Sequence, residues 1–191
     1  MKKKLSLKAI LIPTISLFLI CVVVTAILAL TDSVTAEKIA ENEAQSKESS
    51  MFSVLPDAKT FDEITPDVLY LGKDAAGSPI GYAISTAAQG YGGQVKVMTG
   101  IGTDGKIVGV DVFYNDDETP GLGKNTSNAS FRDQYKGLSA AEDIAVSKDA
   151  SAGNAQTVDA VTSATISSRA VTRAVNEACS IYNEYTAKEA E

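Results

Sequence analysis

The feature that most constrains this chain is an uncharged stretch of 22 residues, Ala9–Leu30, near the start of a 191-residue sequence. As an α-helix with a rise of about 1.5 Å per residue, this stretch is roughly 33 Å long and can cross a hydrocarbon core of about 30 Å. Four lysines precede it within residues 1–8, and the acidic Asp32 follows it. Because a lysine-rich flank stays in the cytoplasm, we expect residues 1–8 in the cytoplasm, a helix spanning the cell (inner) membrane over 9–30, and the rest of the chain outside.

A cleaved signal peptide is the main alternative to a retained anchor. Val34-Thr35-Ala36 resembles a small-residue cleavage site, but cleavable apolar cores usually run for only about 7–15 residues. A lipoprotein anchor is disfavoured because Ile20, and not a small residue, precedes Cys21. The span contains no Asp, Glu, Lys, Arg or His, so we interpret it as an anchor and not as a path for ions.

The composition of the remaining chain excludes several functions. Of the 17 Lys and Arg residues, four precede the span, which leaves 13 against 24 Asp and Glu, a net charge of about −11. Nucleic acid and anionic lipid both attract basic surfaces, so neither is an expected partner. The absence of histidine and the wide separation of Cys21 and Cys179 exclude Ser–His catalysis and a structural zinc site. We therefore predict no catalytic residue, no metal ligand and a buried, unreactive Cys179.

Helical patterns lie on either side of a central β-rich region. Residues 31–56 are rich in Ala, Glu, Lys and Gln and end at Pro56, which favours a solvated helical spacer. Near the other end, Ser163–Tyr185 shows an apolar stripe at helical spacing, which predicts a long amphipathic helix. The stripe comprises Ala164, Ile166, Ala170, Val171, Ala174, Val175, Ala178 and Ile181. A short capped helix is expected over Ser127–Tyr135, and a short strand with loops over residues 142–158.

Four short segments rich in β-branched and aromatic residues lie between Val68 and Tyr114. Their sequences are VLYLG, IGYAIST, QVKVMTGI and KIVGVDVFY. Turn-forming residues separate them, and Asp104-Gly105 is the strongest hairpin signal. The pattern predicts an α+β fold in which residues 57–191 form an extracytoplasmic domain, with one antiparallel sheet covered by helices.

Two segments are not fully explained by local structure. The first is the loop Asp117–Gly123, with the sequence DETPGLG, which follows the last of these strands. A turn accounts for its proline and glycines but not for Leu122, and glycines let a backbone approach a planar ligand closely. This loop is therefore a candidate ligand-binding segment.

The second segment is Asp159–Ser168, with the sequence DAVTSATISS, which leads into the last predicted helix. Five of the seven residues from Thr162 to Ser168 carry a hydroxyl group, whereas an N-cap needs only one. Together with the free amides and the positive end of a helix, these hydroxyls could hold a phosphate group. From the residues alone, helix capping and anion binding by Thr162, Ser163 and their neighbours are equal alternatives.

At these residues the chain resembles the membrane-anchored FMN-binding subunits of the Rnf and Na⁺-Nqr electron-transport complexes. The run DAVTSATISS resembles the flavinylation motif of that family. The resemblance extends to GYGGQVKVMTGI (Gly90–Ile101), to GKIVGVDVFYNDDETPGLG (Gly105–Gly123) and to an anchor followed by an Ala/Glu-rich helix, so it covers most of the chain.

The resemblance implies an electron-carrying role in an ion-translocating ferredoxin:NAD⁺ oxidoreductase (Rnf) complex, with no catalytic activity from the chain without FMN. It implies that FMN is attached covalently, as a phosphoester, to Thr165. It also implies two kinds of partner, the other subunits of the complex and a separate Mg²⁺-dependent flavin transferase that uses FAD. The implied cofactor-binding residues around Thr165 are Asp159, Ser163, Ala164, Ser167 and Ser168, and those of the loop are Glu118, Thr119, Gly121 and Leu122.

Two positions depart from the family pattern. The family usually has glycine where this chain has Ser163, so we infer that the backbone there does not need a conformation open only to glycine. The loop carries Asp117 where the family has histidine, and no role is assigned to Asp117. The shorter chain favours Rnf over the corresponding Nqr subunit, which tends to carry insertions. A free-standing extracytoplasmic flavoprotein, or a non-redox sensor or binding ectodomain whose hydroxyl cluster only caps a helix, remain as alternatives.

Overall fold

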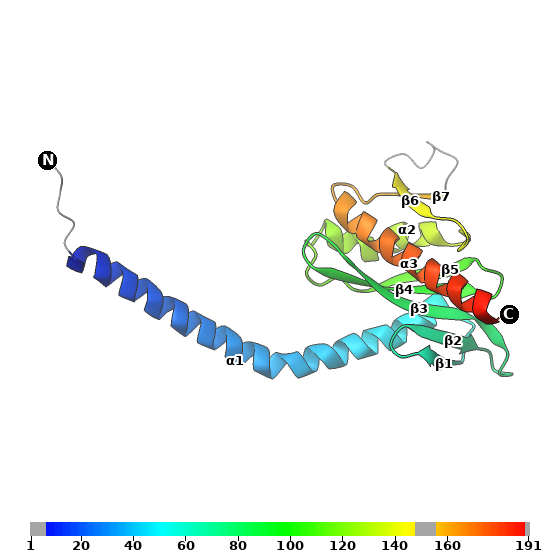
Figure 1. Cartoon of the computed structure of the whole chain (residues 1–191), viewed down its shortest axis with the longest axis horizontal. Helices are drawn as coiled ribbons and strands as arrows, with labels where there is room; N and C mark the ends of the chain where they lie inside the picture. Colours follow the sequence, from blue (N-terminus) through cyan, green and yellow to red (C-terminus); the bar gives the residue numbers. More distant parts are fainter. Residues whose placement is uncertain (1–6, 148–155, 190–191) are drawn as a thin grey trace. The chain divides into compact units, whose positions relative to one another are not determined.

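The computed structural model describes residues 7–147 and 156–189, and it divides the chain into two compact units that meet between Ala44 and Gln45. Helix α1, Leu7–Val54, contributes to both units (Figure 1). Most of the predicted cytoplasmic segment, and residues 148–155 of the segment predicted to be strand and loops, lie outside the described residues.

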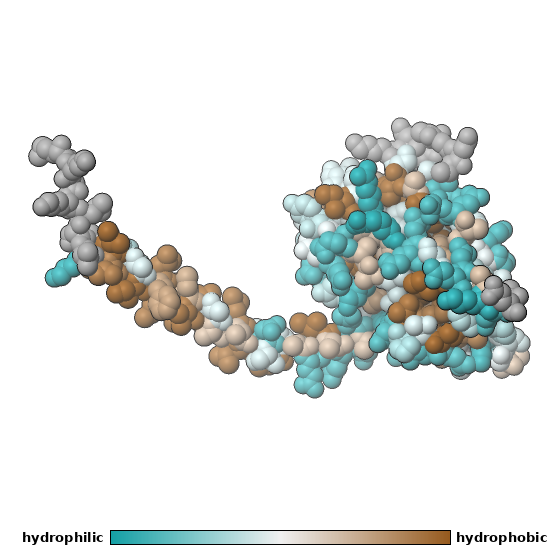
Figure 2. All heavy atoms as spheres, in the orientation of Figure 1, coloured by the Kyte–Doolittle hydropathy of each residue, from teal (hydrophilic) through white to brown (hydrophobic). Residues whose placement is uncertain are grey.

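The first unit contains the part of α1 that ends at Ala44. Its large apolar side chains from Ile10 to Leu30 are all exposed, and Figure 2 shows them gathered along the helix. The helix is long and apolar enough to cross a membrane, and none of its apolar window is buried in the protein. The span predicted from the sequence is thus helical, and the described part of the protein does not bury its apolar side chains.

The second unit contains a five-stranded antiparallel sheet in which neighbours in sequence are neighbours in space. The strands are β1 (Thr60–Thr65), β2 (Leu69–Lys73), β3 (Pro79–Gln89), β4 (Gln94–Gly102) and β5 (Ile107–Tyr114). The last four confirm the four predicted strands. Strand β1 was not predicted because Asp62 and Glu63 lower its β propensity, as is common at a sheet edge where charges discourage pairing with another chain.

Helix α3, Thr165–Glu189, packs against β3 and β4 on one face of the sheet (Figure 1). Its residues Ala170, Val171, Ala174, Val175 and Ala178 are completely buried, which confirms the predicted stripe over most of its length. Two residues of the stripe differ, because Ile181 is only half-buried and Ile166 is 54% exposed. Cys179 is buried as predicted, and burial raises the pKa of its thiol to about 11.

The last turns of α1 cover the opposite face of the sheet. Val54 and Ser50 are buried, and the Ser50 hydroxyl donates a hydrogen bond to the Asp111 carboxylate at 2.6 Å. A side chain at Gly100 would come within 2.5 Å of the Val54 carbonyl oxygen, so glycine there lets the helix end lie directly on β4. The expectation that the spacer is solvated as far as residue 56 is therefore wrong for its end, which forms part of the core.

Between the sheet and α3, the chain forms short helical turns rather than the single capped helix predicted over Ser127–Tyr135. These are η1 (Gly123–Ser127), α2 (Ala129–Arg132) and η2 (Asp133–Tyr135). Asn128 has an extended backbone and makes no side-chain cap, so the helix breaks there. Two further strands, β6 (Ile144–Ser147) and β7 (Gln156–Asp159), pair in parallel and lead the chain toward the start of α3.

Candidate functional site

A cleft of about 590 Å³ lies where the start of α3 meets the loop after β5 and the turn between β3 and β4. This volume falls within the range of roughly 300–1,000 Å³ that is typical of sites for small molecules. The cleft is lined by Tyr91, Glu118, Thr119, Leu122, Gly123, Ser163, Ala164, Thr165, Ile166 and Ser167. The structure thus brings together seven of the ten residues that the sequence suggested for cofactor binding.

Thr165 is the first residue of α3 and is half-buried in the wall of this cleft. The first hydrogen bond of the helix runs from the amide of Ser168 to the carbonyl oxygen of Ala164, at 2.9 Å. In the described parts of the chain, the backbone amides of residues 165–167 donate no hydrogen bond to a protein acceptor. These amides and the positive end of a 25-residue helix favour an anionic group beside Thr165.

Helix capping by Thr162 or Ser163, one of the two alternatives drawn from the sequence, is not observed among the described residues. Both residues are exposed, and the residue directly before the helix is Ala164, whose side chain has no acceptor. Instead, the hydroxyl of Ser168 accepts a hydrogen bond from the Val161 amide and donates one to the Ala164 carbonyl, both at 3.0 Å. Ser168 is completely buried and reaches no cleft, so it shapes the turn before Thr165 from within the protein.

Ser163 adopts a left-handed backbone conformation, with φ of 61°. A residue with a Cβ atom pays about 1–2 kcal/mol there, which glycine avoids. The left-handed region favours glycine but is open to serine, which agrees with the inference that this position does not need a conformation open only to glycine. The strain lies two residues before Thr165, in the turn that places Thr165 at the helix start.

Glu118 is the most buried acidic residue of the site, at 2% exposure. Its Oε1 accepts hydrogen bonds from the backbone amides of Tyr91 (2.7 Å) and Gly92 (3.4 Å), and its Oε2 accepts one from the Ser167 hydroxyl (2.7 Å). The carboxylate therefore joins the three segments that form the cleft. The sequence suggested that Glu118 contacts the cofactor, but both of its oxygens are bound to protein donors.

Three apolar side chains project into the same cleft from three different segments. Tyr91 is 71% exposed, Ile166 is 54% exposed and Leu122 is 40% exposed. In the described chain after α1, only one other large hydrophobic side chain, Val108, is classed as exposed. Exposed apolar groups that converge on one cleft are typical of a site for a planar apolar ligand.

Sequence reasoning singled out Leu122 but missed Tyr91 and assigned Ile166 to the core stripe. The signal for Tyr91 was an aromatic residue between glycines, in a turn where it has no core to join. Ile166 continues the apolar spacing of α3, but its side chain is exposed at the cleft and not packed in the core.

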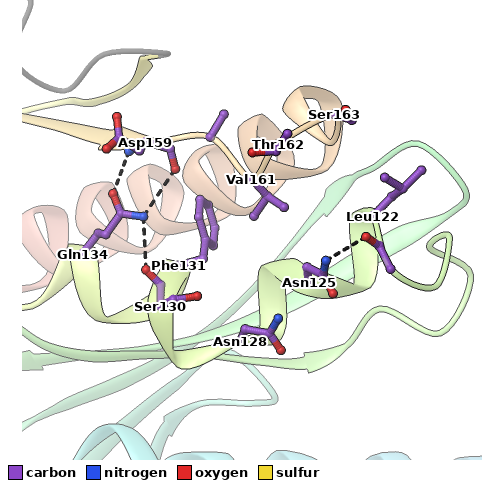
Figure 3. A pocket seen from close by; sticks show the side chains of 12 residues that line it. Leu122, Asn125, Asn128, Ser130, Phe131, Gln134, Asp159, Val161, Thr162 and Ser163 are labelled. Carbon is purple, nitrogen blue, oxygen red and sulfur yellow. Dashed lines mark hydrogen bonds between the residues drawn. The ribbon is translucent and has the colours of Figure 1, made fainter.

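A second cleft, of about 530 Å³, adjoins the first, and Leu122 and Ser163 border both (Figure 3). The predicted residues Gly121 and Asp159 line this second cleft and not that of Thr165. The Asn125 side-chain amide donates a hydrogen bond to the Gly121 carbonyl oxygen at 2.8 Å. Side-chain amide and hydroxyl groups also line this second cleft, and they come from Asn125, Asn128, Ser130, Gln134 and Thr162.

Among the residues that the structure describes, no group of three or more His, Cys, Asp or Glu residues could hold a metal ion. The chemistry that the first cleft can support is therefore that of hydroxyl groups, free backbone amides and one buried carboxylate.

Two family models match the chain. Residues 90–180 match an FMN-binding domain, and residues 1–54 match the RnfG N-terminal region. The first match contains Tyr91, the loop with Glu118 and Leu122, and Thr165, so it includes every segment of the first cleft.

Curated relatives match along most of their length. The chain is 36% identical over 185 residues to the G subunit of the Na(+)-translocating ferredoxin:NAD(+) oxidoreductase complex of Acetobacterium woodii, covering 87% of this chain and 88% of that protein. It is 31% identical over 173 residues to the G subunit of the proton-translocating ferredoxin:NAD(+) oxidoreductase complex of Clostridium ljungdahlii, covering 91% and 89%.

A solved structure has the same fold. The crystal structure of the C subunit of the Na(+)-translocating NADH-quinone reductase from Parabacteroides distasonis superimposes with a TM-score of 0.53 and 25% sequence identity. The match covers 61% of each chain.

Proposed function

The chain belongs to the family of G subunits of ion-translocating oxidoreductase complexes, and we propose that it carries electrons in a ferredoxin:NAD⁺ oxidoreductase (Rnf) complex through FMN bound covalently to Thr165. Among the described residues one helix is long and apolar enough to cross a membrane, which makes the chain a single-pass membrane protein. The proposal places the domain after residue 30 outside the cytoplasm, because lysines precede the span and acidic residues follow it.

The observation that carries the proposal is the position of Thr165 in a cleft that offers two different environments. The amides of residues 165–167 suit a phosphodiester, which keeps one negative charge. Tyr91, Leu122 and Ile166 suit the planar and partly apolar ring system of a flavin. A bound FMN would supply the ability to accept and donate electrons, and the protein would position and tune it.

The residues of the chain shape the site around Thr165, but we propose that they do not catalyse the attachment of FMN. The Ser168 hydrogen bonds to residues 161 and 164 shape the turn, and Glu118 joins the loop to the start of α3. Attachment requires that the Thr165 oxygen forms a bond to the FMN phosphorus of FAD while AMP leaves and the hydroxyl proton passes to a base. The chain has no histidine, so we assign that base to a separate flavin transferase.

Ion passage is assigned to other subunits of the complex. The stretch Ala9–Leu30 has no Asp, Glu, Lys, Arg or His, whereas proteins that move ions through a bilayer keep such groups at depth. One relative is named for Na⁺ and another for protons, at identities of 36% and 31% to this chain. Both observations agree with a protein that carries electrons and does not select the ion.

The proposal is tested by Thr165→Val, with Thr165→Ser as the matched control, each produced together with a flavin transferase. Valine keeps the shape of threonine and removes the hydroxyl, so covalent flavin should be lost. Serine keeps the hydroxyl and should retain it. The change near a helix start should lower stability by only about 1 kcal/mol, too little to unfold the domain.

In-gel flavin fluorescence after denaturation, with the mass of the peptide that contains residue 165, measures the outcome. Covalent flavin that persists in Thr165→Val would move the attachment site to another residue such as Thr162. A wild-type chain that carries no flavin under these conditions would refute the electron-carrying role.

A further inference from the structure

The carboxylate of Glu118 is buried at the wall of the Thr165 cleft. Its partners are two backbone amides and the Ser167 hydroxyl, and all three donors are neutral. Among the described residues, no Lys or Arg side chain pairs with it. Lys124, the nearest basic residue in the sequence, pairs with Asp116 at 3.2 Å.

The surrounding chain is shaped to admit this charge. A Cβ atom at Gly90 would lie 2.1 Å from the Glu118 Oε1, and one at Gly123 would lie 2.0 Å from the Oε2. Two segments far apart in the sequence therefore leave out side chains where the carboxylate sits. Burying an ionised group costs free energy that its hydrogen bonds offset only in part.

The joining of the three segments does not by itself require a charge. A glutamine at position 118 could accept the two amide hydrogen bonds with its carbonyl oxygen and donate one to the Ser167 hydroxyl oxygen. The feature that glutamate adds is a fixed negative charge, which is screened only weakly because it is buried beside the cleft.

We propose that Glu118 is a tuning residue that holds the reduction potential of the bound flavin low, an inference that rests on the proposed function. Each electron taken from a one-electron donor adds one negative charge to the flavin, unless a proton is taken up with it. A buried carboxylate nearby makes that added charge less favourable. The electron is thereby held less tightly and passes more readily to the next acceptor.

The test compares the midpoint potential of the covalently bound flavin in the full-length wild-type chain and in Glu118→Gln, by dithionite titration at pH 8. The potential should be more positive in Glu118→Gln. Asp104→Asn is the matched control, because it also replaces an acid by its amide and changes the net charge equally. Asp104 follows the far end of β4, a nine-residue strand roughly 30 Å long, so the control potential should equal that of the wild type.

Ser167→Ala separates the effect of charge from that of a loosened site. It removes one donor from the ionised carboxylate and keeps the charge, so the potential should stay unchanged or become more negative. A loosened site would shift the potential in the same direction in Ser167→Ala and Glu118→Gln. If Glu118→Gln does not fold, Ser167→Ala decides the question: a more positive potential overturns the inference, and an unchanged or more negative potential supports it.

Three results would overturn the inference: an unchanged potential in Glu118→Gln, an equal positive shift in Ser167→Ala, or a shift that disappears in 1 M salt, where exposed charges are screened. The mass of each chain is measured first, by mass spectrometry, to establish whether it carries flavin. A wild-type chain without flavin refutes the proposed function, whereas a flavin-loaded Glu118→Gln chain with the wild-type potential refutes only the role of Glu118.

Discussion

The side-chain amide of Gln134 makes two hydrogen bonds with the backbone of Asp159, one as acceptor and one as donor (Figure 3). Its Oε1 accepts a hydrogen bond from the Asp159 amide at 2.7 Å, and its Nε2 donates one to the Asp159 carbonyl oxygen at 3.3 Å. The two residues are 25 positions apart. This pairing holds the end of β7, six residues before Thr165, against the helical turns that follow η1.

Replacement of Gln134 by leucine should therefore weaken both stability and flavin attachment. Loss of the paired hydrogen bonds should lower the free energy of unfolding by about 1 kcal/mol, and the less ordered segment should accept FMN more slowly. Urea denaturation and the time course of in-gel flavin fluorescence measure the two effects. Asn128→Ala, which removes an exposed amide that lines the second cleft together with Gln134, should alter neither stability nor the rate of attachment. Equal rates in Gln134→Leu and wild type would show that the pairing does not order the attachment segment.

Ser163→Gly should stabilise the domain. Glycine removes the cost of about 1–2 kcal/mol for a Cβ atom in the left-handed region but adds about 0.5–1 kcal/mol of backbone entropy, so a net gain of up to about 1.5 kcal/mol is expected. Thermal denaturation followed by circular dichroism measures it. Ser163→Ala keeps the Cβ atom and serves as the control, with no gain. A Ser163→Gly chain less stable than the wild type would mean that the serine side chain contributes more than its strain costs.

The Cys179 thiol should react with iodoacetamide only when the chain unfolds. Its pKa of about 11 leaves about one thiol in a thousand ionised at pH 8, and its side chain is buried. Because the unfolded thiol ionises above a pH of about 8.5, ionisation favours the unfolded state, and stability should fall as the pH rises from there toward 11. Labelling of Cys21→Ser protein with and without urea tests this, and rapid labelling of the folded chain would contradict it.

The orientation of the chain can be tested with reporter fusions. Alkaline phosphatase, which is active only outside the cytoplasm, should be active when fused after Glu191, because the lysine-rich flank precedes the span. A fluorescent protein that matures only in the cytoplasm should be dark at the same position and bright when fused before Met1. The reverse pattern would refute the proposed orientation of the chain.

The features that sequence reasoning predicted well depend on local patterns. The uncharged stretch Ala9–Leu30, strands β2 to β5 and helix α3 follow from hydropathy and from the periods of strands and helices. The hydroxyl-rich run that contains Thr165 was recognisable because it lies in one continuous segment. Strand β1 was missed because its pairing with β2, and not its own composition, makes it a strand.

Only the tertiary structure decided which polar groups meet across long distances in the sequence. The sequence by itself determined that Glu118 and Ser167 lie in chemically unusual segments, but their hydrogen bond joins residues 49 positions apart. It likewise did not indicate that Ser168 is buried or that Ile166 faces a cleft, because helical spacing repeats regardless of where the helix meets the sheet. Local patterns express the conformational preferences of short segments, whereas burial and hydrogen-bond partners arise only when those segments pack together.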